Sequence, residues 1–438
     1  MRLSAARSAG TNRGVSLVVS NPPGPRPPVD PLAPPAISPS GGASAHRSSR
    51  LPGFDKLSLE DRQIVLAFSA DLARNDLNAL VDGGLDGEAV DRLIENGIGR
   101  YTLPLGLGLN FRINGQDVVA PMALLQPAVV GAASEAALLV RGGGGFLADA
   151  DEPILTMQVE LLGVRDRTAA VVKLRDATSV LLEQANAALP RLVARGGGAR
   201  GVEARVVGSG DRLVVHLHVD CRDALDLEAL HAVGDALSGP LAALTGARLG
   251  LRAVTPLFDR LCVRARARVP VAALGASEQE GALVAARIDA ASRFAEEDPY
   301  RAAAHNASIL AGAMPVVLAT GNDVHAVGAG VHAFAARLGR YRPLSTWRAT
   351  GAELLGEVEM PLAVGTIGAV PTAHRGARAA LALTKARSAR ELAMVIASVG
   401  LASNLASLRA LASDDHAGAR SETAVSFIRR HDDGGSGR

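Results

Sequence analysis

Two short blocks of the chain carry residue types suited to acid–base or oxyanion chemistry. The first reads DPYRAAAHNASILAG over residues 298–312, and its polar candidates are Arg301, His305 and Asn306. The second reads ATGND over residues 319–323 and ends at Asp323. In a pocket Asp323 would have a raised pKa and act as a base, whereas on the surface it is a turn residue. His305 and His374 are candidate site residues, or structural histidines satisfied by backbone carbonyls.

Other catalytic patterns are missing from the sequence. It contains no Gly-x-Ser-x-Gly, no His-Glu-x-x-His and no phosphate-binding loop with a lysine. The two cysteines, Cys221 and Cys262, lie in strand-like segments without metal-ligand or redox spacing, so we expect buried thiols, no metal and a reduced, cytoplasmic setting.

Composition narrows the class of protein. The 438 residues are 48% hydrophobic and 21% charged, as in packed globular chains of two or three domains. The 46 basic and 44 acidic residues give a net charge of +2, so the balance argues against nucleic-acid and membrane-surface partners. The sequence contains no run of about 18 apolar residues, so we expect no membrane-spanning helix. The apolar patch at residues 15–19 is too short for a secretion signal.

The elements that would position the two blocks can be read along the chain. Residues 1–50 form a Pro/Ser/Gly-rich tail that we expect to be disordered, whether it binds a partner or is an unselected extension. Helices are predicted over 57–80, with Ser58 as cap, over 126–140 and over 391–411. A hairpin is predicted at 110–119 around Asn114 and Gly115, and an apolar strand over 315–320.

A segment of different character lies between these elements. Residues 151–255 alternate strand, helix, strand and helix, which predicts a small inserted α+β domain of the ferredoxin-like kind. The strand at 261–269 that follows places three arginines on one face: Arg264, Arg266 and Arg268. We expect nearby acids to balance them, because no stacking aromatic residues accompany them as in a nucleic-acid site.

Several motifs in the same order resemble the second, bacterial class of hydroxymethylglutaryl-CoA reductases. The two blocks above are similar to that family's DPYRAATHNKG and TGND sequences. Residues 94–99 (IENGIG) are similar to its ENVIG loop, 145–146 to its GGF turn, and 220–225 to the strand before its DAMGAN helix. Residues 359–361 and 399–401 match two further blocks, and the resemblance runs from about Leu51 to about Ala412.

The resemblance implies an α+β protein with a particular division. It implies a large α/β domain for dimerisation and CoA-thioester binding (51–150 and 256–412), and an inserted small NAD(P)-binding domain (151–255). A C-terminal flap would follow, of which 413–438 is a shortened remnant. It further implies a homodimer or higher oligomer, with sites at the subunit interface and the loop at Glu95 and Asn96 lining the neighbouring site. The reaction interconverts hydroxymethylglutaryl-CoA and mevalonate with NAD(P)H.

The family's catalytic residues fall on changed positions. Its oxyanion-stabilising lysine falls at Ala307, its general-acid glutamate at Gln126, and its flap histidine at Arg420, with His416 four positions earlier. Only the aspartate is retained, as Asp323. An amide at Gln126 cannot deliver a proton at any useful pH.

Binding positions change in the same direction. Three polar residues of the family become alanines: Ala128, Ala304 and Ala311. Arg301, with His305 and Asn306, remains for substrate contact. In the cofactor region, which begins at Asp223, the DAMGAN glycine and asparagine become Asp226 and Glu228, whose carboxylates would repel dinucleotide phosphates.

Three hypotheses follow. The chain is a dimeric acyl-CoA- or partner-binding protein with reductase activity lost or much reduced. It is a nicotinamide-independent acyl-CoA enzyme that uses Asp323 with His305. Or it is an active reductase, as the family resemblance implies, with NAD(P) as cofactor.

Overall fold

The computed structural model describes residues 16–17, 48–70, 74–208, 210–225 and 227–413. The chain divides into two compact units. The small unit contains 154–222 and 227–255, together with residues 16–17, and the large unit contains the other described residues. Helices and two β-sheets in these units confirm the mixed α+β class.

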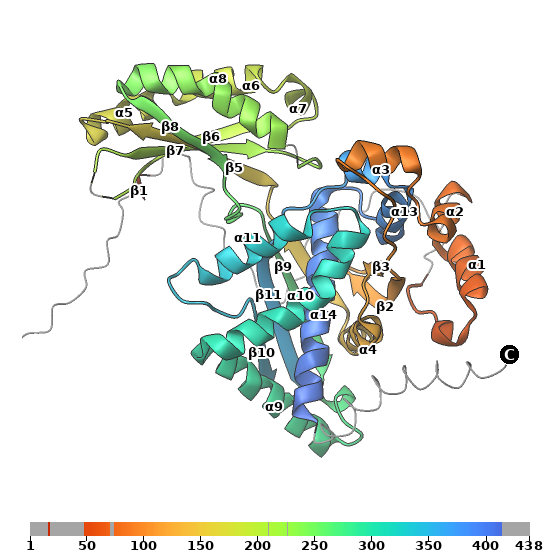
Figure 1. Ribbon diagram of the computed structural model, residues 1–438. Coiled ribbons are helices and arrows are strands. Elements are labelled where there is room, and N and C mark those ends of the chain that lie inside the picture. Colours follow the sequence, from red (N-terminus) through yellow and green to blue (C-terminus); the bar gives the residue numbers. More distant parts are fainter. Residues whose placement is uncertain (1–15, 18–47, 71–73, 209, 226, 414–438) are drawn as a thin grey trace, which may run out of the picture. The chain divides into compact units, whose positions relative to one another are not determined.

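The small unit is one antiparallel sheet with helices on one face (Figure 1). Its sheet order is β1-β6-β7-β5-β8. The strands are β1 (Ser16–Leu17), β5 (Ile154–Leu162), β6 (Gly198–Val206), β7 (Leu213–Asp220) and β8 (Arg248–Val254). The helices are α5 (Arg167–Asp176), α6 (Thr178–Ala187), α7 (Pro190–Ala194) and α8 (Leu227–Thr245). From β5 to β8 the chain follows the β-α-β-β-α-β path of ferredoxin-like domains.

The large unit is built on a six-stranded sheet of order β10-β11-β9-β4-β2-β3. All neighbours are antiparallel except β2 and β4. The strands are β2 (Leu105–Ile113), β3 (Gln116–Ala123), β4 (Phe146–Ala150), β9 (Cys262–Pro270), β10 (Ser345–Thr350) and β11 (Glu353–Pro361).

Helices cover this sheet and extend beyond it (Figure 1). The long ones are α4 (Pro127–Gly142), α9 (Glu278–Glu297), α10 (Pro299–Ala319), α11 (Val324–Ala336) and α14 (Ala389–Ala412). The short ones are α1 (Leu59–Ala70), α2 (Arg74–Asp82), α3 (Gly87–Leu93), α12 (Ala369–Ala373) and α13 (Arg375–Thr384), with 3-10 turns η1 (Phe54–Lys56) and η2 (Val271–Ala273).

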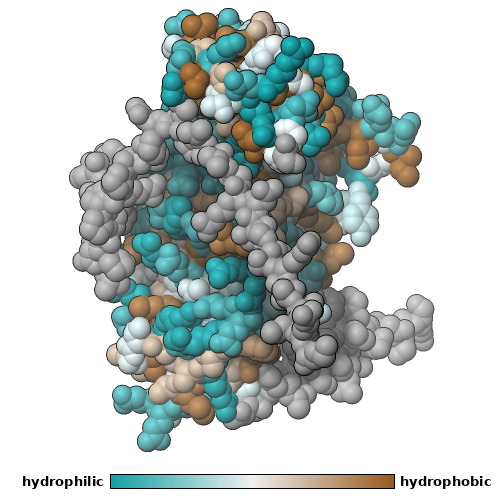
Figure 2. Space-filling view, turned by 90° about the vertical axis from the view of Figure 1, so that its left-hand side faces the viewer, coloured by the Kyte–Doolittle hydropathy of each residue, from teal (hydrophilic) through white to brown (hydrophobic). Residues whose placement is uncertain are grey.

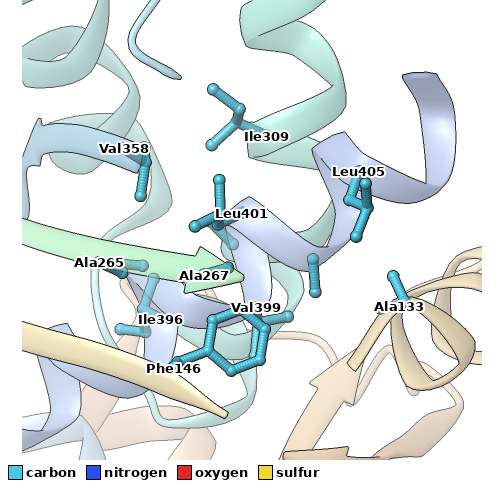
Figure 3. Close-up of a cluster of buried hydrophobic side chains, with 14 of the residues drawn as sticks. Ala133, Phe146, Ala265, Ala267, Ile309, Val358, Ile396, Val399, Leu401 and Leu405 are labelled. Atoms are coloured by element: carbon cyan, nitrogen blue, oxygen red, sulfur yellow. The ribbon is translucent and has the colours of Figure 1, made fainter. Parts of the chain in front are cut away.

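The core of the large unit lies around α14. Figure 3 shows Ile396, Val399 and Leu401 of this helix among side chains from β4, β9 and α10, including Phe146 and Ile309. All five of these side chains are almost fully buried. Packing of this kind supplies most of the free energy that keeps such helices in place.

Among the residues that the structure describes, two helices, α10 and α14, are long and apolar enough to cross a membrane. More than half of the apolar stretch of each is buried inside the large unit, where the two helices pack against each other. Their apolarity is therefore accounted for by the protein core. Figure 2 shows hydrophilic and hydrophobic residues interleaved over the described surface of one face.

Several local predictions are confirmed. The hairpin turns at Asn114 and Gly115, both with positive φ (49° and 80°), as the type I′ turn requires. Ser58 caps α1 through its Oγ, which accepts from the Asp61 amide at 3.1 Å. The arginine face of β9 is balanced by acids, with Arg264 paired to Asp149, Asp151 and Glu359. Both cysteines are buried, and burial raises the pKa of Cys262 to about 12.

Two local predictions are wrong. Residues 315–320 are not a strand, because α10 continues through Pro315 to Ala319, buried against β3 and α14. The predicted tail also ends before residue 50. Ser49 is 2% exposed, its Oγ donates to the Phe111 carbonyl at 2.8 Å and its amide donates to Asp117 at 2.8 Å. Most of the tail, and the flap remnant after Ser413, lie outside the described residues.

Candidate functional site

The large unit contains a cavity of about 620 Å³ near Asp323. Its wall is formed by the end of α10, the N-termini of α11 and α13, the segment that joins α2 to α3, and the start of β2. Most of the lining is apolar. Its polar residues include Asp82, Arg100, Tyr101, Asn322, Asp323 and His374. A cavity of this size and composition is typical of a small-molecule site.

Asp323 is the N-cap of α11. Its Oδ1 accepts hydrogen bonds from the His325 and Ala326 amides at 2.8 and 3.0 Å. The turn before it is fixed by Asn322, whose Oδ1 accepts from the Gly365 amide at 2.8 Å. The carboxylate is exposed, so it joins a structural capping role to a position on the cavity wall.

His374 caps α13 with its ring. Its Nδ1 accepts from the Gly376 and Ala377 amides at 3.1 and 3.3 Å. Because Nδ1 is an acceptor, the neutral ring must carry its proton on Nε2. Burial lowers the pKa of His374, which keeps the ring neutral.

The segment Asp82–Leu85 forms one wall of the cavity. The Arg375 amide donates to the Gly84 carbonyl at 2.8 Å, and a Cβ at Gly84 would lie 2.2 Å from the Gly376 nitrogen. Glycine is therefore required at position 84, where φ is 73°. The Gly84 amide and the paired Arg375 lower the pKa of Asp82. Arg100 Nη1 donates to the Leu85 carbonyl at 2.7 Å.

The other catalytic positions lie outside this lining. Gln126 is the exposed N-cap residue of α4 and makes no capping bond with its side chain. Ala307 is exposed on α10, on the same helix face as Ala304 and Ala311. Arg420 and His416 lie outside the described residues.

His305 and Asn306 are buried, at 1% and 0% exposure. Asn306 accepts from the Leu344 amide at 2.9 Å and donates to the Arg342 carbonyl at 2.8 Å. In the described part of the chain, the cavity beside Asp323 is lined by neither His305 nor Asn306. The structure thus does not bring His305 and Asp323 together as an acid–base pair within that cavity.

A hydrogen-bond network fixes the protonation of His305. Asn404 Oδ1 accepts from Trp347 Nε1 at 2.7 Å and from Ser345 Oγ at 2.9 Å. Ser345 has thus used its only proton, so it accepts from His305 Nε2 at 2.7 Å. His305 Nδ1 is left buried without a partner. Burial, with Arg301 nearby, lowers the pKa of His305 to about 4.

The remaining predicted residues have distinct places. Asp223 Oδ1 accepts from the Ala389 amide at 2.8 Å, at the start of α14. Arg301 is half-buried at the start of α10. Glu95 and Asn96 are exposed in the loop after α3, where Asn96 has a φ of 58°.

The sequence pattern gave no prediction for Arg100, Tyr101 and Asp82. A signal was present for the first two, because they directly follow the IENGIG loop at 94–99. Asp82 precedes the Gly83-Gly84 pair, which is a turn signal in the sequence. Its partner Arg375, at the start of α13, can be identified only in the folded chain.

Comparison with known proteins places these features in a family. Residues 58–422 match the model of hydroxymethylglutaryl-coenzyme A reductase. The chain is 38% identical over 378 residues to the 3-hydroxy-3-methylglutaryl-coenzyme A reductase of Archaeoglobus fulgidus, covering 86% of this chain and 85% of the relative. It is 29% identical over 320 residues to a probable reductase of Borreliella burgdorferi, covering 73% of each.

Solved structures agree with the sequence comparison. The reductase of Streptococcus pneumoniae matches with a TM-score of 0.80 at 36% identity, covering 83% of this chain and 99% of that one. A class II structure of that enzyme bound to NADPH, in open conformations, matches equally well. This chain belongs to the hydroxymethylglutaryl-coenzyme A reductase family.

Proposed function

We propose that this family member is a cytoplasmic, homodimeric acyl-CoA-binding protein whose reductase activity is lost or much reduced. The observation that carries the proposal is the pair of changed positions on α10 and α4. A developing alkoxide would face Ala307, which offers no charge, and Gln126, which offers no acidic proton. Loss of a single oxyanion donor commonly lowers kcat by about a hundred- to a thousandfold.

The cavity beside Asp323 supports a binding role. It combines apolar walls with a few polar groups, which suits an acyl chain, and a helix cap and a pinned loop hold those groups. Binding can therefore persist where the catalytic side chains are gone.

The region that follows Asp223, where the family binds its dinucleotide cofactor, carries acidic side chains in this chain. Glu228 is exposed in the first turn of α8, where its charge would oppose dinucleotide phosphates. Asp226 lies outside the described residues. Like charges at about 4 Å in a partly hydrated site cost about 1 to 4 kcal/mol, so we expect NADH and NADPH to bind weakly.

Two measurements test the proposal. Purified protein with hydroxymethylglutaryl-CoA should oxidise NADH or NADPH at least a hundredfold more slowly than ordinary family members. Calorimetric titrations with NADH, NADPH and CoA, each alone, should show heat of binding with CoA only. Reductase turnover near the family range would refute the loss of activity, and an absence of CoA binding would refute the binding role.

An active reductase is the second candidate. The 38% identity to a curated reductase over most of both chains favours it, as does Arg100, a cation in the same cavity as Asp323. The NADPH-bound structure is that of the Streptococcus pneumoniae enzyme. Under this alternative both NADPH and CoA would bind, and NADPH would be consumed at a rate that depends on Arg100.

A further inference from the structure

We infer that the outer edge of β6 in the small unit is a docking surface for an extended apolar strand, and that the chain's own residues 15–19 occupy it. Strand β1 is the described part of that segment. The docking surface belongs to the small unit, whereas the cavity beside Asp323 belongs to the large unit. The inference goes beyond the proposed function and holds for a binding protein and for an enzyme alike.

Without β1, β6 would be an edge strand of the small sheet. On one side β6 pairs with β7 from its first residue to its last. On the other side Ser16 lies opposite Arg205 and Leu17 lies opposite Ala204, in an antiparallel ladder. An edge strand leaves alternate backbone amides and carbonyls without a partner, and a further strand satisfies them. The ladder therefore identifies both the edge that is used and the register of the strand that uses it.

The sequence limits the docked segment to a few residues. Residues 15–19 read VSLVV, and the proline-rich stretch PPGPRPP follows at residues 22–28. Valine favours strands, whereas proline lacks the N–H that a ladder needs. Continued in the same register, the ladder would bring residues 18 and 19 opposite Glu203 and Val202. The uncharged, strand-forming part of the tail is thus in register with the middle of β6.

The two edges of the small sheet differ in burial. Helices pack against both edge regions, α5 and α6 against β6 and α8 against β8. Strand β8 is nevertheless mostly exposed, with Leu251 at 76%. In the middle of β6, Val202, Glu203 and Ala204 are almost fully buried. Helix packing is common to both edges, so the difference points to the added strand at β6.

Glu203 is the most informative of these residues because it faces away from the helices. Its neighbour Val202 shares a row of the sheet with Met157, which packs against Gly234 of α8. Side chains alternate along a strand, so Glu203 lies on the other face, where its carboxylate is 3.4 Å from His218 Nε2. Glu203 is only 6% exposed. A strand beyond the edge accounts for the burial of a carboxylate at this position.

The docked segment comes from the same chain. Strand β1 is paired with β6 of its own chain, and both belong to one compact unit. The linker therefore reaches. Pairing within one chain does not weaken on dilution, whereas pairing between two copies does. At micromolar concentration the tethered segment should thus exclude a second copy from the β6 edge.

A pair of cysteines tests the register and the identity of the strand. Ser16→Cys with Arg205→Cys puts thiols on opposite residues, whose Cα atoms in an antiparallel ladder are about 4.5 to 5.5 Å apart, within the span of a disulfide. Ser16→Cys with Arg200→Cys is the matched control, because Arg200 is a second exposed arginine of β6. The native cysteines, Cys221 and Cys262, are buried.

Denaturing electrophoresis without reductant, after mild oxidation, gives the result. The first pair should form a disulfide within one chain in most molecules, and the control should form at least about tenfold less. A disulfide between two chains would overturn the assignment to the chain's own segment. Equal yields in the two proteins, or no disulfide in the first, would overturn the register and with it the inference.

Hydrogen exchange tests the docking without new cross-links. Leu17→Pro with Val18→Pro removes two successive amides, and since successive amides point to opposite sides of a strand, one of them is directed at β6. Leu32→Pro with Ala33→Pro makes the same kind of change elsewhere in the tail and is the control. Thermal unfolding shows that both variants are folded.

Peptides from β6 should exchange at least about tenfold faster in the first variant and at the wild-type rate in the control. Peptides from β7 should keep their protection in both, because β7 is paired on both sides. The synthetic peptide GVSLVVSN, added to the first variant, should restore the protection of β6. Unchanged exchange of β6 in the first variant, or a peptide without effect, would overturn the inference, and neither measurement involves a CoA ligand.

Discussion

The side chain of Asp323 has two separable roles, since one oxygen caps α11 and the carboxylate as a whole supplies charge to the cavity wall. Asp323→Asn keeps a capping oxygen and removes the charge, whereas Asp323→Ala removes both. We expect the free energy of unfolding to change by less than about 0.5 kcal/mol in the first variant and to fall by about 1 kcal/mol in the second. Chemical denaturation measures both values.

The Asp323→Asn variant also tests whether Asp323 performs chemistry. In a binding protein, this variant should bind CoA as tightly as the wild type, and neither protein should turn over an acyl-CoA. A wild-type reaction on an acyl-CoA that disappears in Asp323→Asn, with stability unchanged, would contradict the binding role and favour an enzyme that uses this carboxylate.

His305 should make stability depend on pH. Its pKa is about 4 in the folded chain and about 6.5 when unfolded, because burial favours the neutral ring. The unfolded state therefore binds more protons between these values, and the free energy of unfolding falls as the pH drops from about 7 to 4. The loss should reach about 3 kcal/mol.

A variant isolates this contribution from the other titrating groups. His305→Gln keeps a donor for Ser345 but does not titrate. The difference in unfolding free energy between wild type and variant should shrink toward low pH. A difference that is constant from pH 7 to 4 would show that His305 is not held neutral by the fold.

The crossing of α10 and α14 depends on a close approach of backbones at Gly312. A Cβ there would lie 2.5 Å from Ser403 Cβ and 2.8 Å from the Val399 carbonyl oxygen. Gly312→Ala must push the helices apart, so we expect the free energy of unfolding to fall by about 1 to 3 kcal/mol. Thermal or denaturant unfolding gives the value.

Gly131 provides the matched control, because it is also inside a helix, α4, but a Cβ there meets nothing within 4 Å. Gly131→Ala should raise the free energy of unfolding by about 0.5 to 1 kcal/mol through helix propensity alone. Equal effects of the two substitutions would mean that the close approach at Gly312 does not constrain the packing.

Elements with a strong local signal could be predicted from the sequence, and those decided by packing could not. The hairpin at Asn114 and Gly115 follows from turn chemistry, and α14 from its apolar period. Within residues 315–320, Pro315 locally favours the end of a helix, and the two valines that follow it favour a strand. Burial of that turn between α14 and β3 overrides the preference, and α10 continues to Ala319.

The candidate site was predictable in part for the same reason. Asp323 lies in a conspicuous turn, and it does line the cavity. The wall opposite combines residues near 84, 100 and 374, which are joined by long-range contacts such as the Arg100–Leu85 hydrogen bond and the Arg375–Asp82 ion pair. No local pattern encodes such a contact. A motif therefore located one side of the cavity, and tertiary structure was needed for the other.

At the scale of the whole molecule, the loop after α3 exposes three large apolar side chains that are close together in the chain. Ile94, Ile98 and Tyr101 are 63%, 105% and 85% exposed within eight residues. Such a group favours a subunit contact, and we expect the wild type to be a dimer or higher oligomer at micromolar concentration.

Ile98→Glu tests this expectation with little effect on the fold, because the fully exposed side chain of Ile98 leaves no cavity when it is replaced. Burial of a glutamate at a two-fold contact would bring like charges together and leave them without solvent, so the variant should sediment as a monomer. Arg92→Gln, an exposed change in the neighbouring helix α3, should keep the wild-type mass.

Sedimentation equilibrium gives both masses, and thermal unfolding at a concentration where the wild type dissociates should give equal midpoints for both variants. A monomeric wild type, or an Ile98→Glu variant of unchanged mass, would show that this loop does not join two copies of the chain.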